Sequence, residues 1–341
     1  MNIRFNMKKI LLILIFLFCI NVNASIVVMD ADSGRILYSK NKNEKKLIAS
    51  TTKIMTTLIA LENAKLTDKL KVGNEIRTVD GSMIYVKENE TFTLNDLLHG
   101  LMLQSGNDAA MIIASKIMPY DNFIAKMNLK AHKLGMNNTI FENPHGLNDD
   151  TKDYSTAEDM SKLMRYAIKN KDFIKVTSAK KYKVKNYIWY NKNKLLSEYK
   201  YLISGKIGYT KASGQVFVSA AKKGNKTLII ASIDESDKFN LHKNLYEKYF
   251  KDYERYKVLD KNTFSFKVKN KDHDHYYIKN DFDMLLTKEE LKKLKIKVNL
   301  SKNKNYANIY LEDNLIHSEK LYILKYQSRL KKLKELLLFW K

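Results

Sequence analysis

Ser50 and Lys53 have the clearest chemical potential in this chain of 341 residues. They open an apolar run, residues 54–61, that predicts a buried helix. Residues three apart lie on one helical face, so the Ser50 hydroxyl and the Lys53 amine can meet. Burial weakens a lysine's preference for the charged form, and a neutral amine beside a hydroxyl makes an activated nucleophile without a histidine. Alone, the spacing S-x-x-K is a weak signal, because an N-capping serine followed by a solvated lysine gives the same pattern.

Two later stretches complete an ordered set of motifs. The sequence S-G-N at 105–107 follows an apolar segment and precedes a helix of small residues. The sequence K-I-G at 206–208 comes before a strand-like run at 215–221. The order S-x-x-K, S-x-N, K-x-G matches the motif set of penicillin-binding proteins and β-lactamases, although the middle motif reads S-G-N here instead of S-D-N.

The chain resembles the D-alanyl-D-alanine carboxypeptidases, the low-molecular-mass penicillin-binding proteins. Residues 49–56 are similar to the family's nucleophile helix, and residues 103–110 to its second motif. The sequence N-P-H-G-L at 143–147, followed by Y-S-T-A at 154–157, is typical of these carboxypeptidases and not of β-lactamases. The resemblance is close over residues 25–255. It implies an α+β fold of the penicillin-binding-protein and β-lactamase type, in which an antiparallel sheet is flanked by helices.

The resemblance also implies a role for each motif residue. Ser50 is expected to be the nucleophile and Lys53 its base. Ser105 would relay a proton to the leaving amine, and Asn107 would donate its side-chain amide to the carbonyl of the peptide being cut. Lys206 would supply positive charge for the substrate's terminal carboxylate.

Substrate contacts are expected along the third motif as well. By family analogy the oxyanion would lie between the backbone N–H groups of Ser50 and Tyr209, with Gly208 beside them. Removing one such donor typically costs about 10²–10³ in rate.

Ile207 is the clearest departure from the family pattern, which usually has a threonine there. That threonine's hydroxyl would help to bind the carboxylate, and isoleucine has none. Thr210 is a nearby substitute. Lys238 lies where the family tends to place a carboxylate-binding arginine, and it could hold the carboxylate as a point charge. We therefore hypothesise that Ile207 weakens recognition of the carboxylate and affinity for β-lactams.

The histidines do not predict a metal site or a catalytic imidazole. His145, within N-P-H-G-L, is expected to make a structural hydrogen bond in a turn. His273 and His275 flank Asp274, but no third ligand is near in the sequence. No phosphate-binding glycine motif is present either, so no cofactor and no metal are expected.

The first 24 residues have the features of a secretory signal. Basic residues precede an apolar segment at 10–20, which is short for a membrane-spanning helix. The sequence V-N-A at 22–24 fits cleavage before Ser25. An uncleaved N-terminal anchor is the alternative. The single cysteine, Cys19, lies in this segment, so the mature chain would need no disulfide outside the cytoplasm.

The formal net charge is +24. Such a charge often indicates nucleic acid binding, but the predicted export argues against that partner. Anionic lipid head groups or wall polymers fit an exported protein better. A lysine-rich composition that serves solubility would give the same charge.

Hydrophobic patterns predict the elements that position the motifs. A hairpin is expected at 25–38, and S-x-x-E at 155–158 predicts a capping box. Strands at both ends with helices between them favour one sheet assembled from the two ends of a catalytic domain, residues 25–255. The predicted helices and strands of its interior are helices 47–64, 94–117, 120–135, 155–171 and 237–250, and strands 214–222 and 226–233.

The remaining sequence predicts two further parts. Residues 251–262 are expected to form a charged crossover, and residues 256–317 a small β-rich domain with alternating strands. Residues 318–341 have an apolar stripe edged by lysines and ending near Trp340, which predicts an amphipathic helix lying on an anionic membrane surface. A helix packed on its own β domain, or a dimer contact, is the alternative.

The functional interpretation is a serine D-alanyl-D-alanine carboxypeptidase. It would remove the terminal D-Ala from peptidoglycan stem pentapeptides through an acyl-enzyme on Ser50, with β-lactams as covalent inhibitors. It would act in the periplasm or on the outer face of the cytoplasmic membrane, peripherally anchored. A D,D-endopeptidase is the second reading. A catalytically weak wall-binding or β-lactam-sensing protein, suggested by Ile207, is the third, and a β-lactamase fits less well because of the S-G-N motif and the appended domain.

Overall fold

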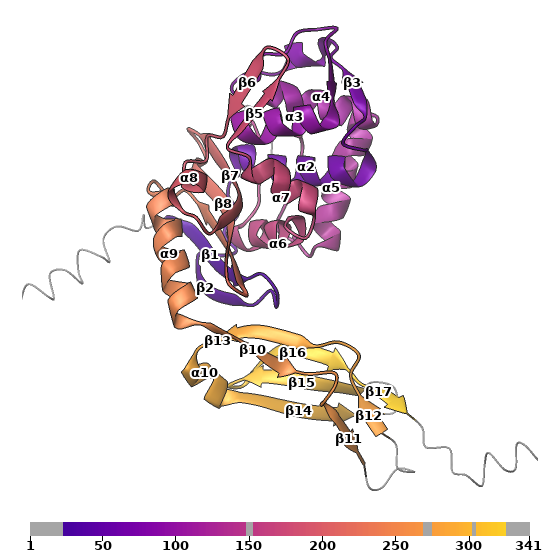
Figure 1. Ribbon diagram of the computed structural model, residues 1–341, viewed down its shortest axis with the longest axis vertical. Coiled ribbons are helices and arrows are strands. Elements are labelled where there is room, and N and C mark those ends of the chain that lie inside the picture. The colour runs from indigo at the N-terminus through magenta and orange to yellow at the C-terminus, as the bar shows by residue number, and fades with distance from the viewer. Residues whose placement is uncertain (1–22, 148–152, 269–274, 302–304, 325–341) are drawn as a thin grey trace, which may run out of the picture. The chain divides into compact units, whose positions relative to one another are not determined.

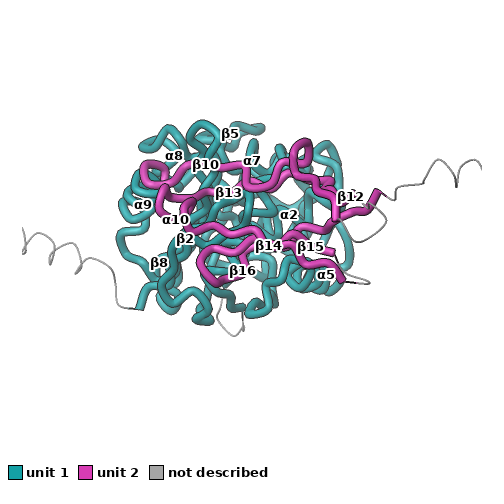
Figure 2. Tube along the Cα trace, turned by 90° about the horizontal axis from the view of Figure 1, so that it is seen from below, with its two compact units in different colours: residues 1–249 teal, residues 250–341 magenta. Residues whose placement is uncertain are grey.

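The computed structural model describes residues 23–147, 153–268, 275–301 and 305–324 (Figure 1). The chain divides into two compact units, residues 1–249 and 250–341 (Figure 2). The predicted domain boundaries after 255 and 317 stay predictions. The apolar segment of the predicted signal lies outside the described residues.

A five-stranded antiparallel sheet forms the centre of the first unit. The strand from the start of the chain pairs with a strand some 200 residues later, with Val27 opposite Ala231. The predicted assembly of one sheet from the two ends of the domain is therefore confirmed. Across the sheet the strands are β2 (Ile36–Lys40), β1 (Ser25–Asp30), β9 (Lys226–Ile233), β8 (Gly214–Lys223) and β7 (Leu202–Thr210).

Both faces of the sheet are covered, which explains why the inner strands are buried along almost their whole length. Val27, Val218 and Ala231 share one face and belong to the main hydrophobic core with the helices. The opposite face carries Phe217 and Ser232, which contact helix α9 (Lys238–Asp252). Figure 1 shows α9 on one side of the sheet and the helices of the main core, such as α2, α5 and α6, on the other side.

The helical region lies between β2 and β7 in the sequence. Its main elements are the 3₁₀ turn η1 (Ala49–Thr52), α2 (Lys53–Asn63), α3 (Leu94–His99), the π-helical turn η3 (Gly100–Gln104), α4 (Asn107–Ile117), α5 (Tyr120–Lys133), α6 (Ala157–Ala167) and α7 (Lys171–Ser178). Smaller elements are β3 (Lys69–Lys71) paired with β4 (Thr91–Thr93), η2 (Asn74–Thr78), β5 (Lys181–Val184) paired with β6 (Tyr187–Tyr190), and α8 (Leu195–Glu198).

Three details of the helix predictions need correction. The single helix predicted over 94–117 is interrupted at Ser105, whose φ of +67° is left-handed and ends the π-helical turn. The capping box predicted at Ser155 does not cap α6: Thr156 caps this helix instead, by accepting the Asp159 N–H at 3.1 Å. The helix predicted to continue to 171 stops at Ala167, and a new helix follows.

The second unit is rich in β-structure, as predicted. Its described residues form three small sheets, with strand orders β10-β13, β11-β12-β17 and β14-β15-β16. Its core includes Leu259, Tyr276 and Ile309. Its elements are β10 (Glu254–Leu259), β11 (Ser265–Lys267), β12 (His275–Tyr277), β13 (Phe282–Leu286), α10 (Lys288–Lys293), β14 (Leu294–Leu300), β15 (Asn305–Leu311), β16 (Asn314–Lys320) and β17 (Tyr322–Leu324).

Two further predictions fail in this unit. The segment 251–262, predicted to be a crossover, contains β10, which pairs with β13. The amphipathic helix predicted over 318–341 is wrong for its first seven residues, because β16 runs to Lys320 and β17 covers 322–324. Leu321 between them is buried in the β core. The rest of that helix, residues 325–341, lies outside the described residues.

No helix within the described ranges is long and apolar enough to cross a membrane.

Candidate active site

Ser50 and Lys53 meet as the spacing predicts. Ser50 lies in the 3₁₀ turn η1, and Lys53 is the first residue of α2. The Lys53 Nζ atom is 2.9 Å from Ser50 Oγ. Lys53 is fully buried, whereas Ser50 is partly exposed. A buried amine therefore touches a hydroxyl that solvent and substrate can reach.

Lys53 has two further partners, and both are carbonyl oxygens. Its Nζ atom lies 2.7 Å from Asn107 Oδ1 and 2.6 Å from the backbone oxygen of His145. A neutral amine has two N–H groups and one lone pair. Carbonyl oxygens can only accept, so they occupy both N–H groups and leave the lone pair for the Ser50 hydroxyl proton.

The environment of Lys53 favours the neutral amine. Burial lowers its pKa well below the usual value, and the positive charge of Lys206 lowers it further. The Asp108 carboxylate acts in the opposite direction, but it ranks behind these two causes. The geometry and the pKa direction together give the arrangement of a general base beside a nucleophile.

Asp108, which the sequence analysis overlooked, fixes the loop around the second motif. Its carboxylate accepts the backbone N–H groups of Ile84, at 3.0 Å and 3.1 Å, and of Tyr85, at 2.9 Å. Asn107 is tied to the same loop, since its Nδ2 donates to the Asp80 oxygen at 2.5 Å. That bond uses one of the two amide N–H groups of Asn107 and leaves the other for a ligand.

The third motif lies on β7, the edge strand, which was not predicted as a strand. Lys206 is 2% exposed, and its Nζ atom lies 3.0 Å from Ser105 Oγ and 3.0 Å from the Ile207 oxygen. Burial lowers the pKa of Lys206 to about 7, and the charge of Lys192 acts in the same direction. Lys206 is thus joined to the second motif through Ser105.

Gly208 lets β7 approach the nucleophile's turn closely. A Cβ atom at this position would lie 3.1 Å from the backbone nitrogen of Ser50 and 3.1 Å from the Ile48 oxygen. The backbone N–H groups of Ser50 and Tyr209 therefore belong to two segments that meet here. This is the placement that an oxyanion site between them requires.

Thr210 and Lys238 make their hydrogen bonds away from the motif residues. The Thr210 hydroxyl donates to Ser213 Oγ at 2.9 Å in the turn between β7 and β8. Lys238 is 8% exposed and donates to Gln215 Oε1 on β8. Burial lowers the pKa of Lys238.

Ile207 faces the same side of the sheet as α9. It lies opposite Phe217 in the β7–β8 ladder, and Phe217 packs edge-on against Phe239 of α9. Tyr209 lies opposite Gln215, the partner of Lys238. Ile207 and the Lys238–Gln215 pair therefore lie on the same side of the sheet.

His145 forms the turn contact that was predicted, since its Nδ1 atom accepts the Leu147 N–H at 3.1 Å. Burial lowers the pKa of His145 to about 3, with the charge of Lys53 as the second cause. The ring is therefore neutral at ordinary pH. The backbone oxygen, which no side-chain pattern could indicate, is the part of His145 that contacts Lys53.

Backbone strain marks the site. Ala49, directly before the nucleophile, has a left-handed φ of +46°, which costs energy for any residue with a Cβ atom. Gly146 has a φ of +80°, and a Cβ atom there would lie 2.0 Å from the Ala49 oxygen. The loop that carries His145 can therefore pack on the nucleophile's turn only if residue 146 is glycine.

Gly146→Ala should destabilise the protein by about 3 kcal/mol or more, since a steric clash is added to left-handed strain. Gly135→Ala is the matched control. Its φ is +69°, but nothing lies within 4 Å of the added Cβ, so strain alone should cost about 1–2 kcal/mol. Urea unfolding curves of the two variants give the loss in the free energy of unfolding for each. Equal losses would contradict the close contact between the loop that carries His145 and the turn that carries Ser50.

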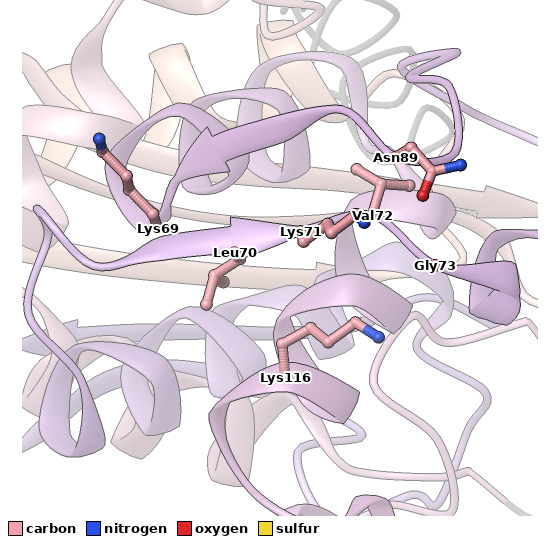
Figure 3. Close-up of a pocket in the computed structure, with 7 residues that line it drawn as sticks. All are labelled: Lys69, Leu70, Lys71, Val72, Gly73, Asn89 and Lys116. Carbon is pink, nitrogen blue, oxygen red and sulfur yellow. The ribbon is translucent and has the colours of Figure 1, made fainter.

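A separate cleft of about 450 Å³ lies beside β3, with Lys69, Lys71 and Lys116 on its walls (Figure 3). Lys116 pairs with Glu75 at 3.1 Å. Lys116 is near the end of α4, whereas Asn107 begins that helix, so nine residues separate them, or about 14 Å along the axis. The cleft therefore does not belong to the motif cluster.

No group of three or more potential metal ligands occurs among the side chains that the structure describes. His273 and Asp274 lie outside the described residues.

Comparisons with known proteins agree with this arrangement. The family model described as D-alanyl-D-alanine carboxypeptidase matches residues 21–237. D-alanyl-D-alanine carboxypeptidase DacF of Bacillus subtilis is 34% identical over 216 residues, which are 60% of this chain and 55% of that protein. DacB2 of Mycobacterium tuberculosis is 34% identical over 210 residues, covering 60% of this chain and 72% of the relative. The chain thus spans only about half the length of some curated relatives.

Solved structures show the same fold. Penicillin binding protein 5 from Haemophilus influenzae superposes with a TM-score of 0.78 and 26% identity, over 88% of this chain and 96% of that one. Penicillin binding protein 6B from Escherichia coli gives a TM-score of 0.71 and 26% identity, over 89% and 94%. Since the first unit ends at residue 249 of 341, matches of this extent include part of the β-rich unit.

The sheet flanked by helices and the three motifs define the class of penicillin-binding-protein-like serine peptidases. More narrowly, the chain belongs to the D-alanyl-D-alanine carboxypeptidase family, the S11 peptidases, which are serine hydrolases.

Proposed function

We propose that this protein is a serine D-alanyl-D-alanine carboxypeptidase that removes the terminal D-Ala from peptidoglycan stem pentapeptides. One observation supports this most strongly. The Lys53 amine has a lowered pKa, and both of its N–H groups are accounted for by carbonyl oxygens, which directs its lone pair at Ser50.

In the proposed reaction, Ser50 Oγ attacks the carbonyl carbon of the penultimate D-Ala while Lys53 takes the hydroxyl proton. The backbone N–H groups of Ser50 and Tyr209 stabilise the oxyanion. Asn107 donates its remaining amide N–H to a substrate carbonyl. The C–N bond then breaks, and the leaving D-Ala amine takes the proton of the Ser105 hydroxyl, which the Lys206 ammonium replaces.

Water then hydrolyses the ester on Ser50 and releases the shortened stem peptide. A β-lactam would enter by the same attack. Its amide is part of a ring, so the broken bond releases no separate leaving group, and the acyl-enzyme retains the whole antibiotic. β-Lactams are therefore proposed as covalent inhibitors.

The pH profile of kcat/KM should be bell-shaped, because it reports the pKa values of the free enzyme. The rate should rise as pH rises through the lowered pKa of Lys53, since only the neutral amine is a base. It should fall above about pH 7, where Lys206 loses the charge that attracts the substrate carboxylate. Lys206→Arg keeps that charge, so the fall of kcat/KM at alkaline pH should move to higher pH. A flat profile across this range would exclude these roles.

Lys206, Gly208, Tyr209, Thr210 and Lys238 are proposed to bind the substrate's end. Lys206 supplies charge from within the motif cluster. Thr210 and Lys238 already have partners in Ser213 and Gln215, so contact with a carboxylate requires those hydrogen bonds to be exchanged.

Restoring a hydroxyl with Ile207→Thr should raise kcat/KM for a pentapeptide by about tenfold or more, because one hydrogen bond to a charged group contributes roughly 1.5–3 kcal/mol. Ile207→Val is the matched control, with the branched shape but no hydroxyl. Steady-state kinetics on both variants provide the measurement. A lower kcat/KM in the threonine variant would mean that Ile207 belongs to an adapted site.

D-Ala release from a synthetic stem pentapeptide tests the proposed activity. Cleavage of purified cross-linked dimers in preference to pentapeptides would favour the D,D-endopeptidase reading. Binding of penicillin without turnover of either substrate would favour the wall-binding or β-lactam-sensing reading.

We further propose that the chain is exported and held at an anionic membrane surface by its last residues. The apolar segment 10–20 and the basic, apolar composition of 325–341 support this. Removal of 325–341 leaves β17 intact and should abolish binding to vesicles that contain anionic lipid, with activity on small peptides unchanged. Equal vesicle binding by the full-length and shortened proteins would exclude the anchor.

A further inference from the structure

We propose that Asp153 is a positioning residue for Lys53, acting through the loop of residues 142–147 whose His145 oxygen accepts a hydrogen bond from the lysine. This inference rests on the proposed function, since it concerns the base of that reaction. The proposed role of Asp153 involves no contact with the substrate or with Ser50. It determines where one acceptor of the Lys53 amine lies.

Asp153 is completely buried, and its carboxyl is directed to the start of the loop. Its Oδ1 atom accepts the backbone N–H of Glu142, and the backbone N–H of Asn143 also hydrogen-bonds to the carboxyl. Its Oδ2 atom has no hydrogen-bond partner among the described residues. A carboxyl is costly to bury, so its presence here indicates that these two backbone contacts matter.

The loop transmits this anchoring by a short series of hydrogen bonds. The Asn143 Oδ1 atom accepts the N–H groups of His145, at 3.0 Å, and of Gly146, at 2.6 Å. Thr56 on α2 donates to the Pro144 oxygen at 2.6 Å. The series ends at the His145 oxygen, 2.6 Å from Lys53 Nζ.

Glu142 and Tyr120 are ionisable groups that act electrostatically on Asp153. Burial raises the pKa of Asp153 to about 7, and the negative charge of Glu142 acts in the same direction. Tyr120 interacts with it from α5. Neither group is a cation. The carboxyl is held by the backbone N–H groups of Glu142 and Asn143 and by the Asn143 side chain, so removal of this acceptor should release the loop.

Asp159 offers a matched control. It is 2% exposed, and its Oδ2 atom accepts a loop N–H, that of Asn138, at 2.9 Å. The hydrogen-bond partners of Lys53 described above are Ser50, Asn107 and His145, and Asn138 is not among them. Asp159→Ala should therefore lower the melting temperature without changing the chemistry at Ser50.

The test is the rate constant for acylation by benzylpenicillin, measured per active enzyme from about pH 5 to pH 9, together with the melting temperature. Asp153→Ala should lower the plateau rate constant by about 100-fold, the effect expected from a displacement of about 1 Å, with little change in the initial binding of the antibiotic. Asp153→Asn, which keeps an acceptor for both N–H groups, should recover most of the rate.

The low-pH side of the pH profile of acylation, its acid limb, provides a second test of the positioning role. A hydrogen bond to the charged form favours that form, so loss of the His145 acceptor disfavours the Lys53 ammonium and lowers its pKa. The acid limb of Asp153→Ala should therefore move to lower pH while the plateau falls. If a residue only stabilises the fold, its loss would change neither the plateau rate constant per active enzyme nor the pH of the acid limb.

The inference would be overturned if Asp153→Ala and Asp159→Ala had the same acylation rate constant and the same acid limb in the pH profile. If Asp153→Ala does not fold, Asp153→Glu provides the same comparison, because it keeps the carboxyl but displaces it by one methylene. About tenfold slower acylation is then expected, and an unchanged rate overturns the inference. A wild-type protein that forms no adduct overturns the proposed function, and this inference with it.

Discussion

Ser50→Ala should abolish formation of the acyl-enzyme and reduce D-Ala release by about 10⁴-fold or more, the loss typical when a nucleophile is removed from a catalytic unit. The hydroxyl is the only group that Lys53 can deprotonate in the arrangement described above, since its other two partners are carbonyl oxygens. The fold should survive, because Ser50 is partly exposed. Penicillin labelling and D-Ala release are the two measurements.

Ser197→Ala is the control for this change, since Ser197 is an exposed serine on α8. It should label and turn over like the wild type. Wild-type labelling by Ser50→Ala would mean that another residue is the nucleophile.

Lys53→Met should be nearly as damaging as the loss of Ser50, because the side chain keeps its bulk but has no lone pair. Parts of one catalytic unit are not additive, so the double variant with Ser50→Ala should lose little more. Lys53→Arg is the sharper comparison. Arginine stays charged even when buried, so it can donate to Asn107 and His145 but cannot act as a base.

The measurement is the acylation rate constant of the wild type, Lys53→Met and Lys53→Arg, each at the pH optimum of the wild type. It distinguishes a lysine that acts as a base from one that acts only through its charge. The arginine variant should be as inactive as the methionine variant. If Lys53→Arg retained a tenth or more of the wild-type rate, Lys53 would serve as an electrostatic group and not as the base.

The nucleophile and its base could be predicted because they lie on one turn of helix. A spacing of three residues fixes their proximity whatever the rest of the fold does, and the structure brings Ser50 and Lys53 to 2.9 Å. The central sheet was predictable for a similar reason. Its inner strands are continuous apolar runs such as residues 226–233, which are legible in the sequence itself.

The contacts that orient the base could not be predicted. The His145 oxygen is a backbone atom 92 residues from Lys53, and no side-chain pattern reports where a carbonyl points. The anchoring carboxyl groups, Asp108 and Asp153, bind backbone N–H groups, which every residue except proline has. Such contacts depend on tertiary packing, which a single sequence does not display.

Local composition also misled the prediction in two places. The edge strand β7 contains two glycines and a buried lysine, so it has no strand-like alternation, yet it pairs along its length with β8. At 318–324 the spacing of apolar residues suggested a helix, but β16 and β17 find partners in β15 and β12. Pairing between distant strands outweighed the local pattern in both segments.

Intact-protein mass spectrometry after incubation with benzylpenicillin, followed by peptide mapping, shows which residue the antibiotic acylates. We expect one adduct per chain, with the mass of the whole antibiotic, on the peptide that contains Ser50. An adduct on any other residue, or no adduct on a folded wild-type protein, would contradict this expectation.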